Sequence, residues 1–262
     1  MLEALNIGVT LGGRNILHDV HFSARPGELT VIAGPNGSGK STLLKAMTGE
    51  IACSGHITLN GHDIRTTKPW KLAAQRGVLS QHTPLAFPFT VAEVVRMGLR
   101  RSTQTPGAAL IPQALARVGL PGYEGRLYQD LSGGEQQRTQ LARVLAQVWT
   151  PTDDDGPRWL FLDEPVSSLD IAHQLQVMQI ARDYADAGGG VVAVMHDLNL
   201  TALYADQMTL ISKGRVHATG TPAQVMQDGI LSSAYDCALR VNAAPTGATF
   251  LLPHAALGLA AE

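Results

Sequence analysis

The sequence predicts an α/β fold built on a mixed sheet, with an N-terminal antiparallel β-subdomain and an inserted α-helical subdomain. Three observations lead to this prediction. The apolar runs "LTVIAG", "WLFLDEP" and "VVAVMHD" are typical of central parallel strands that are buried on both faces. Residues 2–24 mix alternating and continuous β-branched and aliphatic positions, which indicates strands. From about Thr90 to Trp149 the apolar residues recur at helical spacing instead.

Turn signals separate the expected elements of the core. Asn60-Gly61 lies between two short strand-like runs, which predicts a two-residue hairpin turn. Residues 175–188 fit a crossover helix between parallel strands, and residues 211–220 fit a further hairpin. We expect a single domain, with its core in residues 1–81 and 156–262 and its helical subdomain in residues 82–155, approximately.

Composition excludes several classes of protein. The 262 residues, 45% of them hydrophobic, are enough to bury a core, and the formal net charge of -2 argues against a nucleic-acid partner. Cys53 and Cys237 are isolated, so neither a disulfide framework nor a structural metal site is expected. The sequence shows neither a secretory leader nor an apolar run of membrane-spanning length. We therefore expect a cytoplasmic protein, unless another protein holds it at a membrane.

A phosphate-binding loop follows the first apolar run. The stretch "GPNGSGKST" stands directly after "LTVIAG" and directly before the helical pattern "STLLKAMTGE". Its backbone N–H groups can cradle phosphates at a helix N-terminus, while Lys40 reaches the outer phosphates and Ser41 ligates magnesium. The alternative is an ordinary glycine-rich turn. The sequence thus predicts a P-loop NTPase core whose ATP site includes Gly34, Pro35, Asn36, Gly37, Ser38, Gly39, Lys40, Ser41 and Thr42.

Two adjacent carboxylates end the next apolar run. In "WLFLDEP", Asp163 can hold magnesium and Glu164 is the candidate catalytic base. Adjacent residues at a strand end point in different directions, which suits one carboxylate for metal and one for water. The alternative is a solvated pair that opens a turn before Pro165.

Two further polar residues follow apolar strands. His196, in "VVAVMHD", and Gln81, in "GVLSQH", each stand at the end of an apolar strand-like run. Because parallel strands present their carboxyl ends to one crevice, His196 is expected to share the site and contact the γ-phosphate, although a histidine at a strand end is more often structural. Gln81 could hold magnesium or the attacking water, and its alternative role is that of a polar residue entering a loop.

A second glycine-rich stretch, "LSGGEQQR", lies in the helical region. Ser132, Gly133 and Gly134 open a helix whose free N–H groups and dipole favour an anion. No strand precedes them, so they cannot form a second phosphate loop on the same sheet. The insertion places them away from the phosphate loop of their own chain. We expect that they serve the nucleotide of a second copy.

Taken together, "GPNGSGKST", Gln81, "LSGGEQQR", "WLFLDEP", "SSLD" and His196 resemble the nucleotide-binding subunit of an ATP-binding-cassette (ABC) transporter, in family order and over nearly the whole chain. The resemblance implies an ATPase that forms a head-to-tail homodimer. Two ATP molecules are sandwiched there, each between one phosphate loop and Ser132 to Gly134 of the other chain. It also implies that Glu164 is the catalytic base and that Asp163 and Ser41 bind Mg²⁺. His196 would contact the γ-phosphate, and Gln81 would sense it. Asp170 would communicate across the dimer.

One position departs from the family pattern. Members usually place an aromatic residue in the first strand to stack on adenine, whereas "VTLGGR" puts Leu11 there. Adenine stacking is therefore in doubt, and Arg14 is a candidate to lie over the ring instead.

The same resemblance implies separate membrane partners. Two transmembrane permease subunits would dock near His82 to Arg101 and hold the chain at the cytoplasmic face of a bacterial inner membrane, with an extracytoplasmic binding protein as an indirect partner. "PLAFPFTVAEVVRMGLRR" is similar to importers of iron chelates, haem and cobalamin. "TPTDDDGPRWLFLDEP", "FPFTV" and "LDIAHQ" most resemble the haemin importer ATPases, with ferric siderophore and cobalamin importers as alternatives.

Two other classes remain as alternatives. A soluble cassette ATPase acting on DNA or ribosomes usually carries tandem cassettes, long coiled coils or basic arms, and this chain shows none of these patterns. A nucleotide-binding regulator without turnover would not need Glu164.

Overall fold

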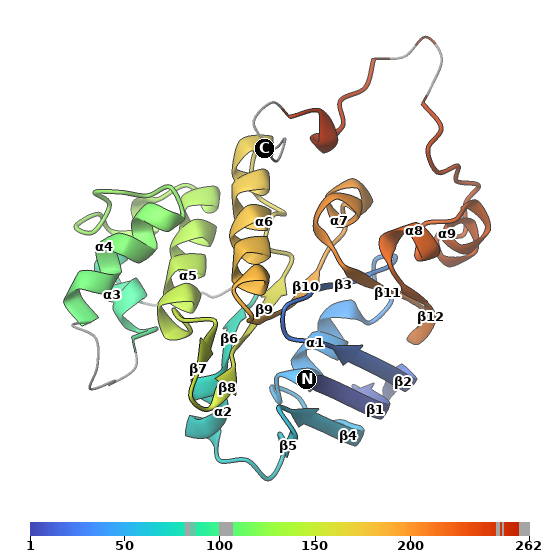
Figure 1. Ribbon diagram of the computed structural model, residues 1–262, viewed down its shortest axis with the longest axis horizontal. Coiled ribbons are helices and arrows are strands. Elements are labelled where there is room, and N and C mark those ends of the chain that lie inside the picture. Colours follow the sequence, from blue (N-terminus) through green and yellow to red (C-terminus); the bar gives the residue numbers. More distant parts are fainter. Residues whose placement is uncertain (82–84, 86, 100–106, 245–246, 248, 257–262) are drawn as a thin grey trace.

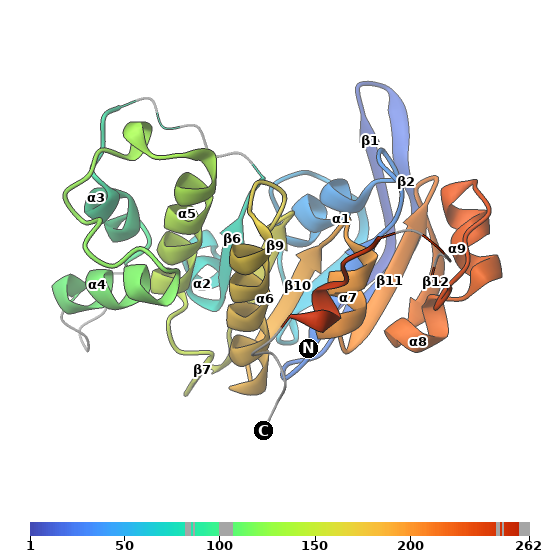
Figure 2. The ribbon, with the colours of Figure 1, turned by 90° about the horizontal axis from the view of Figure 1, so that it is seen from above.

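The computed structural model describes residues 1–81, 85, 87–99, 107–244, 247 and 249–256 (Figure 1). Two large sheets, a small two-stranded sheet and the helices around them make up this part of the chain. Figures 1 and 2 show α3, α4 and α5 together at one end of the molecule, and α8 and α9 at the other.

The first sheet is antiparallel and has the strand order β2-β1-β4-β5. These strands are β1 (Leu2–Leu11), β2 (Arg14–Ala24), β4 (Ser54–Leu59) and β5 (His62–Asp63). The turn between β4 and β5 has positive φ at both Asn60 (51°) and Gly61 (80°), as a type I′ hairpin requires. The predicted hairpin is therefore present.

The second sheet forms the core and has the order β12-β11-β3-β10-β9-β6. Its parallel strands are β3 (Leu29–Ala33), β6 (Arg76–Leu79), β9 (Trp159–Asp163), β10 (Gly190–Val194) and β11 (Gln207–Ser212), and β12 (Arg215–Gly220) closes the edge antiparallel to β11. Every residue of β3, β9 and β10 is buried. These are the continuous apolar runs of the sequence, because helices or the other sheet cover both faces.

Helices pack on both faces of this core sheet (Figure 2). On one face lies α1 (Lys40–Met47), whose Leu43, Leu44 and Met47 join the cluster that also contains the buried side chains of β1 and β2. On the other face lie α6 (Ile171–Asp186) and α7 (Leu198–Tyr204), which pack in a second apolar cluster. The remaining helices near the core are α2 (Pro69–Gln75), α8 (Pro222–Val225), α9 (Asp228–Tyr235) and the short η2 (Pro253–Ala255).

The predicted helical insertion contains α3 (Val91–Arg96), α4 (Gly107–Arg117), η1 (Tyr128–Asp130) and α5 (Gly133–Gln147). Thr90 and Ser132 begin α3 and α5 with capping boxes completed by Glu93 and Glu135. Helix α5 packs closely on β6, where a Cβ added to Gly77 would lie 2.8 Å from Val144 Cγ1. The polar stretch before β9 forms a small hairpin of β7 (Thr152–Asp153) and β8 (Gly156–Pro157). The residue boundaries of the subdomains stay a prediction.

In the part of the chain that the structure describes, none of the helices has both the length and the apolar character needed to cross a bilayer.

Candidate nucleotide and catalytic site

A pocket of about 560 Å³ opens at the carboxyl edge of the core sheet. It lies where β3 leads into α1 and where the chain leaves β6, β9 and β10. Its lining residues are Ile16, Asn36, Gly37, Gly39, Lys40, Ser41, Thr42, Gln81, Glu164 and His196. The pocket thus joins motifs that are far apart in the sequence.

The loop from Gly34 to Gly39 needs glycine at both ends. Gly34 has φ 144°, and a Cβ there would lie 2.0 Å from the carbonyl oxygen of Ile211. Gly39 has φ 105°, and its Cβ would lie 2.6 Å from Leu17 Cδ2. Both the backbone conformation and the close approach of neighbours therefore exclude larger residues.

Lys40 crosses this loop from the start of α1. Its ammonium Nζ donates hydrogen bonds to the carbonyl oxygens of Gly34 and Pro35, both at 2.9 Å. Lys40 is only 5% exposed, and burial lowers its pKa, while the negative charges of Glu164 and Asp163 act in the opposite direction. The side chain places a positive charge inside the loop, as the binding of phosphate requires.

Ser41 and Asp163 form an oxygen-rich pair beside Lys40. The hydroxyl of Ser41 donates to Asp163 Oδ1 at 2.8 Å. Asp163, the last residue of β9, is 2% exposed, and burial raises its pKa although the Ser41 hydrogen bond opposes that shift. A divalent cation would offset this burial of negative charge, and hydroxyl and carboxylate oxygens are the ligands that Mg²⁺ prefers. The donor set therefore fits Mg²⁺.

The described residues contain no group of three or more histidine, cysteine, aspartate or glutamate side chains placed to hold a metal. A cation at Ser41 and Asp163 would thus depend on oxygen atoms of another kind, such as those of a nucleotide phosphate.

The carboxylate of Glu164 has a polar partner at each of its two oxygens. Gln81 Nε2 donates to one carboxylate oxygen at 2.8 Å, and His196 Nε2 lies 2.6 Å from the other. These contacts come from the chain that follows β6 and from the chain that follows β10. Glu164 has φ 52°, a left-handed conformation that is uncommon outside glycine. The structure therefore brings Gln81, Glu164 and His196 together, as parallel strand ends predict.

The stretch from Ser132 to Gly134 does not line this pocket. Ser132 and Gly133 are exposed at the start of α5, and a Cβ on Gly133 would meet open space. The Ser132 hydroxyl donates to Glu135 Oε2 at 2.7 Å. Hydrogen bonds from the Ser132 side chain and backbone and from Tyr123 lower the pKa of Glu135 to about 2. A fixed anion at the first turn of a helix stabilises its N-terminus.

Asp170 also lies outside the pocket. Its carboxylate caps α6 by accepting hydrogen bonds from the backbone N–H of His173, at 2.9 Å, and it lies 2.8 Å from the ring Nδ1 of that residue. The backbone hydrogen bond is the main cause that lowers the pKa of Asp170.

Two residues that contact the site could not be identified from the sequence. Ile16 of β2 lines it and supplies an apolar surface, whereas Leu11 and Arg14 are not among its lining residues. Gln137 of α5 donates from Nε2 to the backbone carbonyl of Glu164 at 3.1 Å. Ile16 follows the Gly12-Gly13 turn and looks like any strand residue, and Gln137 looks like any helix residue, so no local pattern identifies either.

The comparisons with known proteins agree with this geometry. Residues 17–167 match the family model described as "ABC transporter". A "Hemin import ATP-binding protein HmuV" of Jannaschia sp. (strain CCS1) is 61% identical over 257 residues, which cover 98% of this chain and 95% of that one. The protein of the same name from Roseobacter denitrificans (strain ATCC 33942 / OCh 114) is 58% identical over 256 residues, with 97% and 98% coverage.

Solved structures share the fold. An ATP-binding subunit of an ABC transporter has a TM-score of 0.77 at 23% identity, covering 90% of this chain and 96% of that one. A dimeric post-hydrolysis ATP-binding cassette bound to ADP and Pi has a TM-score of 0.74 at 24% identity, with 85% and 99% coverage. The predicted fold class, family and ATP-hydrolysing activity are thereby confirmed. The chain belongs to the ABC transporter family.

Proposed function

We propose that this chain is the ATP-hydrolysing subunit of an importer that brings haem across a membrane. The observation that supports it most is the Glu164 carboxylate, which Gln81 and His196 hold in the pocket that also contains Lys40 and Ser41. Relatives that are 61% and 58% identical over nearly the whole chain carry the name hemin import ATP-binding protein, which favours haem over ferric siderophores and cobalamin.

Different residues of the pocket bind the phosphates, accept the proton from water and orient the catalytic base. The loop N–H groups and Lys40 bind the phosphates of ATP, because together they supply donors and a buried positive charge. Glu164 takes a proton from a water molecule whose oxygen attacks the γ-phosphorus, and ADP is the leaving group. Gln81 and His196 orient Glu164, and His196 also contacts the γ-phosphate.

Ser41 and Asp163 would hold Mg²⁺, which would neutralise the charge of the phosphates. Gln81 would be a third ligand through its amide oxygen, because its Nε2 is the atom that donates to Glu164.

The working unit is a head-to-tail homodimer. Ser132, Gly133 and Gly134 do not line the pocket of their own chain, and Ser132 and Gly133 are exposed at the start of α5. This arrangement favours their use on the ATP of the second copy. Asp170, at the exposed start of α6, belongs to the same dimer surface.

Two permease subunits hold the dimer at the cytoplasmic face of the membrane. Their dock is residues 82–101, which follow Gln81 and so link the pocket to the membrane partner. Residues 82–84, 86 and 100–101 of this dock lie outside the described residues, whereas Thr90 and α3 lie within them. An extracytoplasmic binding protein delivers the haem.

Uptake by cells that lack this gene tests the proposal. The cells receive haemin, a ferric siderophore or cobalamin separately, and are complemented with the wild-type gene or with Glu164→Gln. The proposal expects loss of haemin uptake alone, restored only by the wild type. Loss of another substrate would overturn haem as the cargo and keep the motor, whereas restoration by Glu164→Gln would contradict hydrolysis at Glu164.

A further inference from the structure

The backbone of Glu164 is held by a side chain from outside its own sheet. Gln137 lies in the second turn of α5, the helix that begins after Ser132, and its Nε2 donates to the Glu164 carbonyl oxygen at 3.1 Å. The same oxygen accepts hydrogen bonds from the N–H and hydroxyl of Ser167, at 3.4 and 3.2 Å. Among these donors, only Gln137 belongs to the helical subdomain.

This hydrogen bond acts on an unusual backbone conformation. Glu164 has φ 52°, and its N–H donates to the carbonyl oxygen of Val194 in β10 at 3.1 Å. The peptide groups on both sides of its Cα are therefore fixed, one by β10 and the other in part by α5. Rotation about the Cα–C bond alone would move only the carbonyl, but a shift of the Glu164 Cα on release of the carbonyl would also move the carboxylate relative to Gln81 and His196.

In the described part of the chain, the side-chain amide of Gln137 has a hydrogen-bond partner at its nitrogen but not at its oxygen. Its Oε1 is buried and has no hydrogen-bond partner among the described residues. Gln147, on the same helix, also donates from Nε2 to backbone carbonyls, those of Ala73 and Arg76, at 2.9 and 3.1 Å, but its Oε1 is not left buried without a partner. A buried acceptor without a partner is a cost to stability, and such groups often have a functional reason.

The first turns of α5 contact both ends of the loop between Glu164 and Asp170. A Cβ on Gly134 would lie 3.2 Å from Leu169 Cδ2 and 3.4 Å from the Ser168 carbonyl oxygen. Gln137 follows Gly134 by one helical turn on the same face of α5, and it reaches Glu164. A displacement of the start of α5 would therefore change the hydrogen bond from Gln137 to the Glu164 carbonyl.

We propose that Gln137 is a positioning residue that couples the start of α5 to the orientation of the Glu164 carboxylate in the same chain. The inference rests on the proposed function, in which Glu164 is the base and Ser132 to Gly134 contact the ATP of the partner. Binding of that ATP then adjusts, through Gln137, the base that acts on the other ATP of the dimer.

Steady-state ATP hydrolysis by the purified full chain tests the proposal with Gln137→Met, which keeps the length of the side chain and removes the donor. We expect kcat to fall by roughly tenfold to a hundredfold, as small misplacements of catalytic groups do, with KM for ATP unchanged within about twofold. The matched control is Gln147→Met, which loses the same kind of hydrogen bond at a residue that does not line the pocket, and it should keep the wild-type kcat. A wild-type kcat for Gln137→Met would overturn the proposal.

A second variant gives a readout that a purely structural role would not change. In Gln137→Glu, the introduced carboxyl group can donate to the Glu164 carbonyl only when protonated. The ratio of its kcat to that of the wild type should therefore rise as the pH falls toward the usual pKa of a glutamate, about 4.3. A pH-independent ratio contradicts the positioning role.

A third measurement separates this inference from the proposed function. ATP-dependent dimerisation is compared for Glu164→Gln with and without Gln137→Met, and it should be the same, because the base is already absent. Loss of dimerisation with the added substitution would mean that Gln137 maintains the start of α5, and would overturn the inference. Normal turnover by Glu164→Gln alone would instead overturn the role of Glu164, whatever Gln137 does.

Discussion

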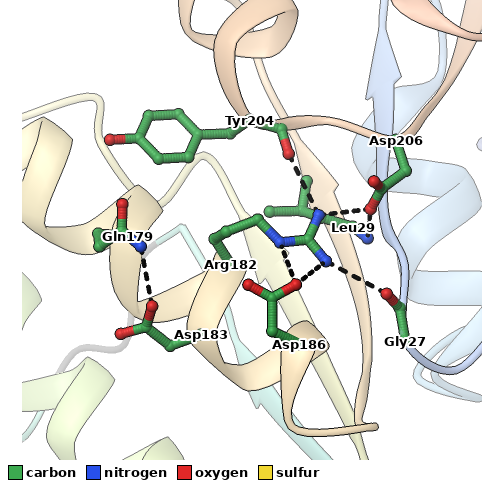
Figure 3. A network of polar contacts seen from close by, with 8 residues as sticks. All are labelled: Gly27, Leu29, Gln179, Arg182, Asp183, Asp186, Tyr204 and Asp206. Atoms are coloured by element: carbon green, nitrogen blue, oxygen red, sulfur yellow. Dashed lines mark hydrogen bonds and ion pairs between the residues drawn. The ribbon is translucent and has the colours of Figure 1, made fainter. Parts of the chain in front are cut away.

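Two buried or half-buried cations at opposite edges of the core sheet, Lys40 and Arg182, are held in different ways. At the carboxyl edge, the ammonium group of Lys40 donates to Gly34 and Pro35, which uses two of its three hydrogens among the described residues. At the amino edge, Arg182 of α6 finds a partner for each part of its guanidinium group (Figure 3). Within the described ranges, Lys40 therefore keeps one hydrogen for a ligand, whereas Arg182 has no hydrogen left to donate.

The network around Arg182 connects three segments (Figure 3). Its Nε and Nη2 contact Asp186 Oδ1 at 3.0 and 2.8 Å, and Nη2 donates to the Gly27 carbonyl at 3.2 Å. Its Nη1 pairs with Asp206, which also accepts from the backbone N–H of Leu29 at 2.8 Å. The result ties α6 to the start of β3 and to the chain before β11, so this edge stabilises the fold.

Around the pocket at the carboxyl edge, polar groups that a ligand could use have no partner among the residues that the structure describes. The Ser38 hydroxyl and Gln137 Oε1 are buried without a hydrogen-bond partner in the described part of the chain, and Glu164 adopts a left-handed conformation. Such costs persist where a ligand or a reaction needs the groups, and the saturated network at the other edge helps to offset them. We infer that substitutions at the carboxyl edge affect turnover, whereas those at the amino edge affect stability.

The largest expected effect is on turnover. Glu164→Gln should lower kcat for ATP hydrolysis by about a hundredfold or more, because it removes the group that accepts the proton from water. ATP binding and the melting temperature should change little. Steady-state kinetics and thermal unfolding measure both, and a variant that loses stability rather than turnover would break the comparison.

The second largest expected effect is on the affinity for ATP. Lys40→Ala should weaken ATP binding by about a hundredfold, because it removes a charge-assisted contact to the phosphates. Titration with a fluorescent ATP analogue measures this. Normal affinity in this variant would count against the assignment of the loop.

At the amino edge, the expected effect is on stability. Arg182→Ala should lower the free energy of unfolding by about 2 kcal/mol, since it leaves Asp206, Tyr204 and Gly27 without a shared donor. The partner carboxylates are partly exposed to water, which limits the loss. Urea unfolding measures the change, and kcat per folded molecule should stay at the wild-type value.

Gln179→Ala is the matched control for this variant. Gln179 lies on the same helix, and among the described residues its side chain donates to the exposed Asp183, at 2.8 Å (Figure 3). Its loss should cost less than about 0.5 kcal/mol. Equal losses in the two variants would show that the network around Arg182 adds nothing beyond one exposed hydrogen bond.

The smallest expected effect is on the way in which the free energy of unfolding depends on pH in acid. In the folded chain the pKa of Glu135 falls from 4.5 to about 2, so the ionised form is favoured by folding. Its contribution to stability is complete above pH 4.5 and is lost as the pH falls from 4.5 toward 2. Glu135→Gln should therefore lose less stability than the wild type across this window in urea unfolding. Parallel pH curves would contradict the prediction.

Much of the site could be predicted because its residues follow strand ends. The apolar runs of β3, β9 and β10 identify parallel strands, and parallel strands bring their carboxyl ends to one edge. That rule places the loop of Lys40 beside Asp163, Glu164 and His196. It needs only local patterns and the order of strands.

The contacts of Gln137 and Ile16 could not be predicted in this way. Gln137 reaches Glu164 because α5 packs on β6 at a particular rotation, which brings one helix face to the loop after β9. Ile16 reaches the pocket because the antiparallel sheet packs against the phosphate loop, with Gly39 against Leu17. Helix rotation and sheet packing depend on residues across the whole core, so no segment specifies them alone.

The sequence by itself determined the chemistry available at the site: a glycine-rich loop with Lys40, a buried aspartate, a glutamate and a histidine, each at a strand end. Only the tertiary structure decided how these groups are held. It set the left-handed backbone of Glu164, its hydrogen bond from Gln137, and the place of Ile16 in the lining of the pocket. Local patterns follow from the spacing of apolar and turn residues, whereas these contacts follow from the packing of segments far apart in the chain.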